Sequence, residues 1–250
     1  MNLLLILAAV VPALILLVQV YRADRLEKEP VSLLLGLVAW GVVAAELAAI
    51  TERAGVWLLN LILGVDAAGG TVPYAAPAMF YYRADPLLYH ALLMFGVVAV
   101  SEEGFKYLLL RRSTWRSEEF NCSFDGIVYA VFLSLGFALW ENIRYVLQYG
   151  FVTALARAVT AVPGHACFGV FMGTWYGAAK RWDLLGEPGR RRLSEWTAFL
   201  IPTLLHGFYD YFAVTASDRA DLLFLPFIAV LFLVSFLMVR HLSRNDTYMA

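Results

Sequence analysis

The chain has little charge and few cysteines. Charged residues make up 16% of its 250 residues, whereas hydrophobic residues make up 61%. Ordinary globular chains carry about 25% charged residues, so this composition excludes a disordered chain and argues against a soluble enzyme. The formal net charge of −1 gives no global charge argument for a nucleic acid partner. Two cysteines cannot form a dense disulfide framework. The sequence also shows no internal repeat.

Long apolar runs fill much of the chain instead. A helix needs about 20 apolar residues to cross a bilayer. Seven segments come close to this length: 3–20, 31–50, 87–109, 126–148, 158–179, 196–215 and 222–239. A weaker apolar stretch, 56–65, is too short to span, and we expect it to extend the second helix or to lie at the interface. The sequence therefore predicts an all-α, multi-pass transmembrane helix bundle.

The distribution of Lys and Arg predicts the orientation of this bundle. The first, third and fifth connections and the C-terminal tail hold 13 of these residues, whereas the other connections hold 5. Basic residues concentrate on the cytoplasmic side of membrane proteins, so we expect the N-terminus outside and the C-terminus in the cytoplasm. The longest outer connection, 64–86, contains glycines, prolines and aromatics. We interpret it as an interfacial aromatic belt, with a lid over a substrate entrance as the alternative.

Polar side chains interrupt four of the predicted spans. They are Glu102, Glu103 and Lys106 on one span, Glu141 and Asn142 on the next, then His165, and finally His206 and Asp210. A charged group at the centre of a membrane helix costs about 2.5–3.5 kcal/mol on insertion scales, so these groups should face inward. At 1.5 Å per residue they lie near the middle and outer half of the membrane, which predicts one shared cavity.

The spacing of these residues suggests which of them pair. Lys106 is four residues after Glu102 and three after Glu103, so it can contact both carboxylates. Asp210 is four residues after His206 and can orient its imidazole. An ionised carboxylate beside an oriented histidine can deprotonate water and stabilise an oxyanion, which is the apparatus of hydrolysis. The structural alternative, in which buried ion pairs only lock helices together, explains one pair more readily than four polar spans.

The same residues form four ordered motifs. Residues 101–106 fit the pattern EExxK, residues 137–142 fit FxxxEN, residues 165–169 fit HxxxG, and residues 206–210 fit HxxxD. This set, which covers about residues 90–215, resembles the PrsW-type intramembrane proteases of the CAAX-protease and bacteriocin-processing superfamily. The first two spans carry no matching motif. We accordingly divide the single membrane domain into N-terminal spans and outer loop (1–86), a catalytic core (87–215), and a final span and tail (216–250).

The resemblance implies an endopeptidase in a bacterial plasma membrane. Its substrate would be a membrane protein or membrane-bound peptide, such as an anti-sigma factor cleaved on the outer side. By motif position, Glu102 would activate water, with Glu103 as its partner carboxylate. His206, steadied by Asp210, would stabilise the oxyanion or help to bind the water.

The resemblance also assigns the remaining polar residues. Glu141 and His165 would complete the polar pocket, and Asn142 would support them. Lys106 would keep a neighbouring carboxylate ionised.

The sequence leaves the use of a metal open. Two histidines and carboxylates suit Zn²⁺, and in that alternative the ligands would be His165, His206, Glu102 and Glu141. However, there is no HExxH motif, and Lys106 places positive charge where a cation would bind. We therefore favour a glutamate-based mechanism without a cofactor.

Other functions fit parts of the pattern. A CAAX-type prenyl-protein endopeptidase would keep the chemistry and change the substrate. A proton- or ion-coupled transporter also uses buried acids and histidines, but transporters commonly show two related halves, which this sequence lacks. A membrane scaffold without activity would explain the polar residues as packing alone. The sequence gives no oligomeric state.

Overall fold

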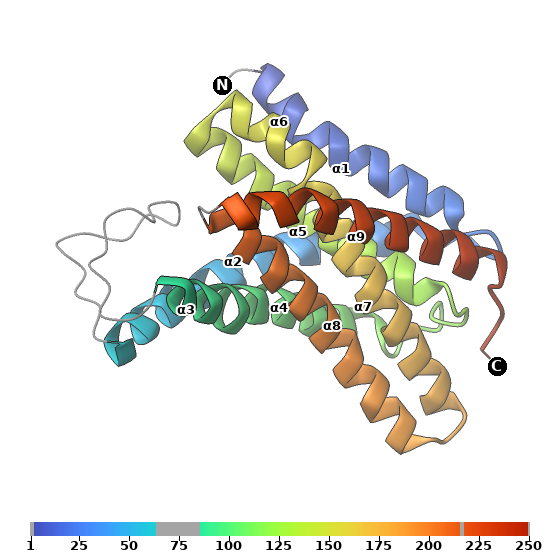
Figure 1. The fold of residues 1–250 in the computed structure, drawn as a ribbon. Helices are drawn as coiled ribbons and strands as arrows, with labels where there is room; N and C mark the ends of the chain where they lie inside the picture. The colour runs from blue at the N-terminus through green and yellow to red at the C-terminus, as the bar shows by residue number, and fades with distance from the viewer. Residues whose placement is uncertain (1–2, 64–85, 216–217, 250) are drawn as a thin grey trace.

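The computed structural model describes residues 3–63, 86–215 and 218–249, and within them every regular element is a helix (Figure 1). The helices are α1 (Leu3–Ala23), α2 (Val31–Leu63), α3 (Pro86–Ala91), the π-helix η1 (Leu92–Ala99), α4 (Val100–Thr114), α5 (Asp125–Tyr149), α6 (Phe151–Val159), α7 (Ala161–Leu184), α8 (Pro188–Val214) and α9 (Asp218–Arg244). An isolated antiparallel bridge joins Cys122 to Tyr248 near the C-terminus. The predicted all-α class is confirmed.

Four helical segments of the described chain are long and apolar enough to cross a membrane. They are Val31–Leu63, Asp125–Tyr149, Phe151–Leu184 and Leu222–Arg244, and α1 adds a shorter apolar stretch, Ala9–Ala23. The predicted spans 87–109 and 196–215 are also helical, but α4 and α8 carry acidic and basic residues that lower their hydropathy. Composition therefore identifies α5 and α7 as spans, whereas it does not identify α4 and α8, the other two helices that hold predicted site residues.

The region after the second predicted span is only partly described. Helix α2 continues to Leu63, so residues 56–63 extend the second helix as one of the two interpretations proposed. The predicted outer loop 64–86 lies outside the described residues except for Pro86, which begins α3. Its roles as an aromatic belt or a lid therefore stay predictions, as does the division of the chain at residues 86 and 215.

A π-helix divides the third predicted span. Residues Leu92–Ala99 form η1 between α3 and α4, and α4 begins directly after it with the residues of the EExxK motif. A π-helix accommodates an extra residue in its turn, so it shifts which side chains face the bundle, and such segments are frequent at functional sites. Periodicity in an apolar run gave no sign of this shift.

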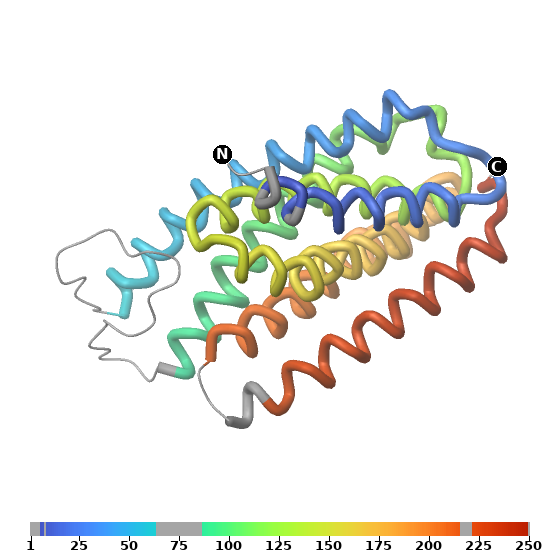
Figure 2. The backbone as a smooth tube through the Cα atoms, turned by 90° about the horizontal axis from the view of Figure 1, so that it is seen from above, coloured from blue at the N-terminus to red at the C-terminus, as the bar shows by residue number. Residues whose placement is uncertain are grey.

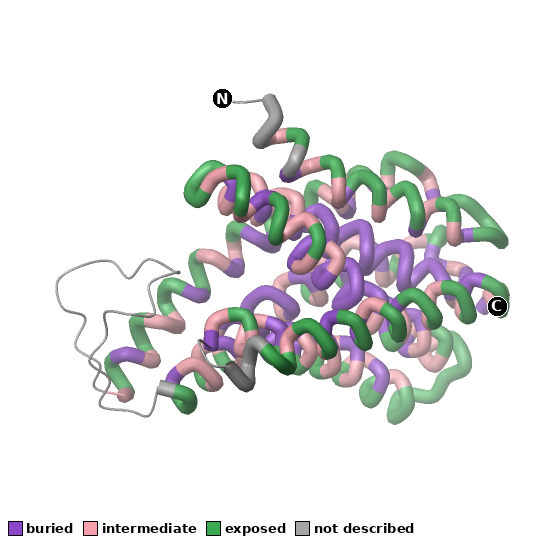
Figure 3. The backbone as a smooth tube through the Cα atoms, turned by 45° about the horizontal axis from the view of Figure 1, so that its top comes forward, coloured by how far each residue is buried: buried purple, intermediate pink, exposed green. Residues whose placement is uncertain are grey.

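Helix α5 forms the centre of the bundle. Its residues from Asp125 to Ala138 are all buried, and α1, α2, α4 and α7 pack around it. Figure 3 shows the buried residues concentrated along this axis. Glycines bring α5 close to α7, because a Cβ atom added at Gly126 would lie 2.6 Å from the carbonyl oxygen of Gly173. Close approach at small residues is typical of membrane helix packing, and here it brings together two helices that each carry a predicted site residue.

The helices alternate in direction, so the basic connections gather at one end of the bundle. Figure 2 shows the connection between α1 and α2, the connection between α4 and α5, and the C-terminus at that same end. The alternation agrees with the uneven distribution of Lys and Arg. Which end faces the cytoplasm stays a prediction.

Candidate active site

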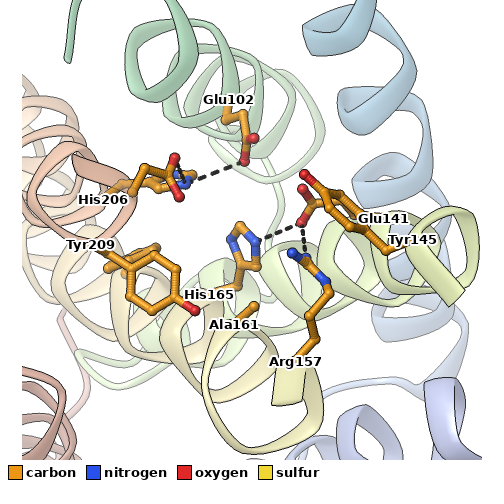
Figure 4. Close-up of a pocket in the computed structure, with 10 residues that line it drawn as sticks. Glu102, Glu141, Tyr145, Arg157, Ala161, His165, His206 and Tyr209 are labelled. Atoms are coloured by element: carbon orange, nitrogen blue, oxygen red, sulfur yellow. Dashed lines mark hydrogen bonds and ion pairs between the residues drawn. The ribbon is translucent and has the colours of Figure 1, made fainter. Parts of the chain in front are cut away.

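Four helices bring predicted site residues to one cavity. Glu102 comes from α4, Glu141 from α5, His165 from α7, and His206 and Asp210 from α8. The cavity has a volume of about 30 Å³, and its wall also includes Tyr145, Arg157, Ala161, Phe168 and Tyr209 (Figure 4). About 10–15 Å³ of such space is enough for one water molecule, so the cavity has room for water and is too small for a peptide segment. The shared cavity expected from the sequence is present.

Lys106 lies behind the cavity wall, and its ammonium is fully buried. The Nζ atom lies 2.8 Å from Glu103 Oε1 and 3.4 Å from Glu102 Oε2, so both expected pairs are confirmed. It also lies 3.0 Å from Nδ1 of His165 and 4.0 Å from the ring centroid of Phe137. An ammonium only donates hydrogen bonds, so Nδ1 of His165 accepts and the ring proton resides on Nε2.

The two adjacent glutamates face different surroundings. Successive residues on a helix point about 100° apart. The Oε1 atom of Glu103 lies 2.8 Å from both Lys106 Nζ and His206 Nδ1, and this side chain does not line the cavity. Glu102 does line the cavity, and its Oε2 atom lies farther from its charged neighbours, 3.4 Å from Nζ of Lys106 and 3.7 Å from Nε2 of His206. Glu102 is therefore the carboxylate of this pair that a water in the cavity can meet.

His206 is held at both ring nitrogens. Its Nδ1 atom contacts Glu103, and its Nε2 atom lies 3.2 Å from Oδ2 of Asp210, as the spacing of the two residues predicted. The ring also stacks on Phe168, with centroids 4.8 Å apart and planes 19° apart. The carboxylates at both nitrogens and the stacked ring together fix the position and the plane of the imidazole.

On the opposite wall of the cavity, Glu141 links His165 to an arginine that the sequence analysis did not select. Its Oε2 atom lies 3.0 Å from Nε2 of His165 and 2.7 Å from Nη2 of Arg157. Arg157 comes from α6, and its position in the sequence contributed only to the count of basic residues that predicts the membrane orientation. A lone arginine in an otherwise apolar segment directly before a polar span was the available signal.

Asn142 supports this wall from outside the cavity. Its Oδ1 atom accepts a hydrogen bond from Nε of Arg157 at 3.3 Å, and its Nδ2 atom donates to the carbonyl of Ala9 on α1 at 3.0 Å. Its neighbour Arg144 pairs with Glu46 at 3.6 Å, on a partly exposed surface. The structure thus brings Asn142 near the site as a support and keeps Arg144 away from it.

Comparison with known proteins identifies the family. Residues 29–239 match the family model described as PrsW family intramembrane metalloprotease. Protease PrsW of Geobacillus kaustophilus strain HTA426 is 38% identical over 215 residues, which are 86% of this chain and 81% of the relative. The chain belongs to the PrsW family of intramembrane proteases. It is an integral membrane peptidase, and all four motif-bearing helices fall inside the matched range.

Further relatives agree over most of the chain. Protease PrsW of Oceanobacillus iheyensis is 32% identical over 238 residues, 95% of each chain. Protease PrsW of Bacillus subtilis strain 168 is 30% identical over 225 residues, 90% of this chain and 88% of the relative. No solved structure matches this chain.

The family description implies a metal ion, and the donor atoms can be tested against it. Glu102, Glu103, His165 and His206 offer donor atoms that all lie within 4.8 Å of one another. This set contains Glu103 where the sequence analysis named Glu141. Zinc binds such atoms at about 2.0–2.2 Å. However, the ammonium of Lys106 lies within 3.4 Å of donor atoms from three of the four residues. As arranged, the residues fit an ammonium and do not fit a metal ion beside it.

Proposed function

We propose that this PrsW-family peptidase cleaves membrane-embedded proteins with a water molecule activated by Glu102. The observation that carries the proposal is that the two glutamates of α4 have different surroundings. Glu102 faces a water-sized cavity, whereas Glu103 is engaged by Lys106 and His206. A general base must reach the proton that it abstracts, and only the first of these carboxylates does so.

The proposed reaction begins with water beside Glu102. The carboxylate takes a proton from the water, whose oxygen bonds to the carbonyl carbon of the scissile peptide. His206, which points Nε2 toward Glu102 and Asp210, donates a hydrogen bond to the oxyanion that forms. The C–N bond then breaks, and the proton held by Glu102 passes to the leaving amine. No step requires a cofactor.

The remaining residues would position this apparatus. Lys106 balances the charge of Glu103, and the neutral His165 connects Lys106 to Glu141. The substrate class that we favour is a single-span membrane protein of the anti-sigma-factor type, because the resemblance of the four motifs to PrsW-type proteases implies it. Membership of a protease family leaves the transporter and scaffold interpretations without support. A prenylated peptide substrate is the alternative that the assay below separates.

Cleavage by purified protein in lipid vesicles tests the base. Wild type, Glu102→Gln and the control Glu46→Gln would be compared on single-span substrates and on a prenylated peptide, each with and without chelator. Glu46 is exposed and lies away from the cavity, so its variant should retain activity. We expect Glu102→Gln to lower turnover by about 10²–10⁴-fold, the range for loss of a general base.

Each other result has a definite meaning. Near-normal turnover by Glu102→Gln would show that the assigned base is wrong. Loss of wild-type activity with chelator, and recovery with Zn²⁺, would replace the proposed mechanism by a metal-dependent one. Cleavage of the prenylated peptide alone would replace the substrate class.

A further inference from the structure

The cavity is too small to admit a substrate, and the exposure of its wall residues directs attention to α6. Its volume of about 30 Å³ admits water and excludes a peptide chain, so part of the wall must move before a substrate reaches Glu102. Three wall residues, Glu141, Arg157 and Asp210, remain partly exposed, with side chains 17%, 16% and 22% accessible. They mark the side on which the cavity comes nearest to the surface.

Among the helices that form the wall, α6 is the shortest and the least buried. It has nine residues, of which only Ala154 is buried, whereas α5, α7 and α8 each exceed 20 residues and bury many. Helix α6 is bounded by two breaks. Gly150 has φ +85° and ψ −167°, a conformation almost restricted to glycine, and Thr160 has non-helical angles between α6 and α7. Both ends can therefore act as hinges.

The two faces of α6 differ in the way expected of a helix between lipid and a polar site. Val152, Leu155 and Val159 are exposed on its outer face. Its inner face places Ala154 in a buried cluster with Ala9 of α1 and Val146 of α5, and directs Arg157 toward the cavity (Figure 4). Among the described residues, Arg157 is the residue of α6 that forms hydrogen bonds with the predicted site residues.

Arg157 fixes the orientation of several groups at once. Its Nη2 atom donates to Glu141 Oε2 at 2.7 Å, and its Nε atom donates to Asn142 Oδ1 at 3.3 Å, while its guanidinium lies 3.9 Å from the ring centroid of Tyr145. The same Glu141 oxygen accepts a hydrogen bond from Nε2 of His165. The arginine thereby holds the carboxylate that accepts a hydrogen bond from Nε2 of His165, and it acts on the proposed base only through these neighbours.

We propose that Arg157 is a positioning residue carried on a hinged gate, α6, whose contact with Glu141 both closes the cavity and aligns His165. When α6 swings away from α1 and α5, Arg157 leaves the cavity wall and the cavity opens to the substrate. When α6 returns, the contact restores Glu141 and His165 around the bound peptide. The inference rests on the proposed function for its meaning in catalysis, but the movement of α6 is measurable without any substrate.

A labelling experiment tests the gate independently of activity. A cysteine placed at Ala161, which lines the cavity, would be labelled with a water-soluble maleimide in vesicles. We expect Arg157→Gln to raise the labelling rate several-fold, because the closed state loses its polar contacts. The control Arg144→Gln removes an arginine of α5 that pairs with exposed Glu46, and it should leave the rate unchanged. Equal rates in the two variants would overturn the gate.

Kinetic measurements and a double variant distinguish a positioning role of Arg157 from an effect on folding. We expect Arg157→Gln to lower kcat by about tenfold or more with a smaller change in KM, and Arg157→Lys to recover part of kcat. An unchanged kcat would overturn the positioning role. Because Arg157→Gln leaves Glu141 unpaired and can unfold the protein, the double variant Arg157→Gln/Glu141→Gln repeats the labelling with no stranded charge.

A reversible cross-link completes the test. Cysteines at Ala9 and Ala154, which belong to one buried cluster, would tie α6 to α1. Loss of cleavage on oxidation, with recovery on reduction, is the expected result. Full turnover by the oxidised, cross-linked protein would overturn the gate. If Glu102→Gln stays active while the labelling result holds, the proposed base fails and the gate stands.

Discussion

Two buried polar clusters of this membrane protein solve the same physical problem differently. The cavity cluster contains four acidic residues, two histidines and two cations: Glu102, Glu103, Glu141, Asp210, His165, His206, Lys106 and Arg157. The terminal cluster contains four acidic residues, Asp24, Glu29, Asp125 and Asp246, where the connection between α1 and α2 meets the start of α5 and the C-terminal tail (Figure 2). The first compensates buried acids with cations, and the second mostly does not.

Burial makes the acids of the terminal cluster harder to ionise. Among the residues that the structure describes, neither Asp24 nor Glu29 forms a salt bridge, and both carboxylate oxygens of Asp24 lack a hydrogen-bond partner. Burial raises the pKa of Asp24 to about 6, with Asp246 and Glu27 adding to the effect and Lys28 opposing it. Burial likewise raises the pKa of Glu29 to about 7, although the hydrogen bond from Tyr129 opposes this. The comparison suggests that charge is retained where the chemistry needs it.

Removing the cation of the cavity cluster should have the largest effect on stability. Lys106→Met leaves Glu102 and Glu103 without their buried counter-ion, which costs about 3–5 kcal/mol for buried pairs. We expect a large fall in the thermal midpoint measured by circular dichroism in detergent. Arg144→Met, which breaks a partly exposed pair with Glu46, should cost at most about 1 kcal/mol. A similar small loss in both variants would show that Lys106 does not compensate the cluster.

Neutralising one acid in each cluster should have smaller effects of opposite sign. Glu103→Gln leaves the ammonium of Lys106 and the ring of His206 without their shared carboxylate, at a cost of about 1–3 kcal/mol. Asp24→Asn removes a buried charge that has no partner, so at pH 8 it should leave stability unchanged or raise it slightly. Chemical denaturation of both variants at pH 8 measures the difference. Destabilisation by Asp24→Asn as large as that by Glu103→Gln would remove the distinction between the clusters.

The sequence predicted the cavity cluster well, because its residues are polar where lipid forbids exposed polarity. Insertion costs required Glu102, Glu141, His165 and His206 to face inward, and the helical repeat placed Lys106 and Asp210 beside their partners. The structure confirms these contacts, while the catalytic roles stay proposals. The sequence did not identify Arg157 as a site residue, because its contact with Glu141 depends on the break at Gly150, which folds a short helix back toward the site.

The sequence was less informative about the spans and the terminal cluster. Hydropathy finds continuous apolar runs, so it could not reveal that η1 divides the third span or that α6 separates from α7 at Thr160. Asp24 and Asp246 lie outside every predicted span and 222 positions apart in the chain, where acidic residues are ordinarily solvated. Their proximity follows from the shared end of α1 and α9, and only the three-dimensional arrangement shows it.

The smallest predicted effect is a dependence of stability on pH that originates in the terminal cluster. The pKa values of Asp24 and Glu29 rise from 3.8 and 4.5 in the unfolded chain to about 6 and 7 in the fold. Groups with raised pKa values stabilise the fold fully below the unfolded values, and this contribution is lost as pH rises through the folded values. Because one unit of pKa shift corresponds to about 1.4 kcal/mol, we expect stability to decline by about 1 kcal/mol or more between pH 4 and pH 8.

The variant Asp24→Asn/Glu29→Gln isolates this contribution, since neither new side chain titrates. Subtracting its unfolding free energy from that of wild type at each pH cancels the titration of the cavity cluster. The difference should become less favourable to wild type as pH rises from 4 to 8. A difference that is flat, or that grows in favour of wild type, would mean that these carboxyls stay ionised in the fold. The two clusters would then differ in their partners but not in how they hold charge.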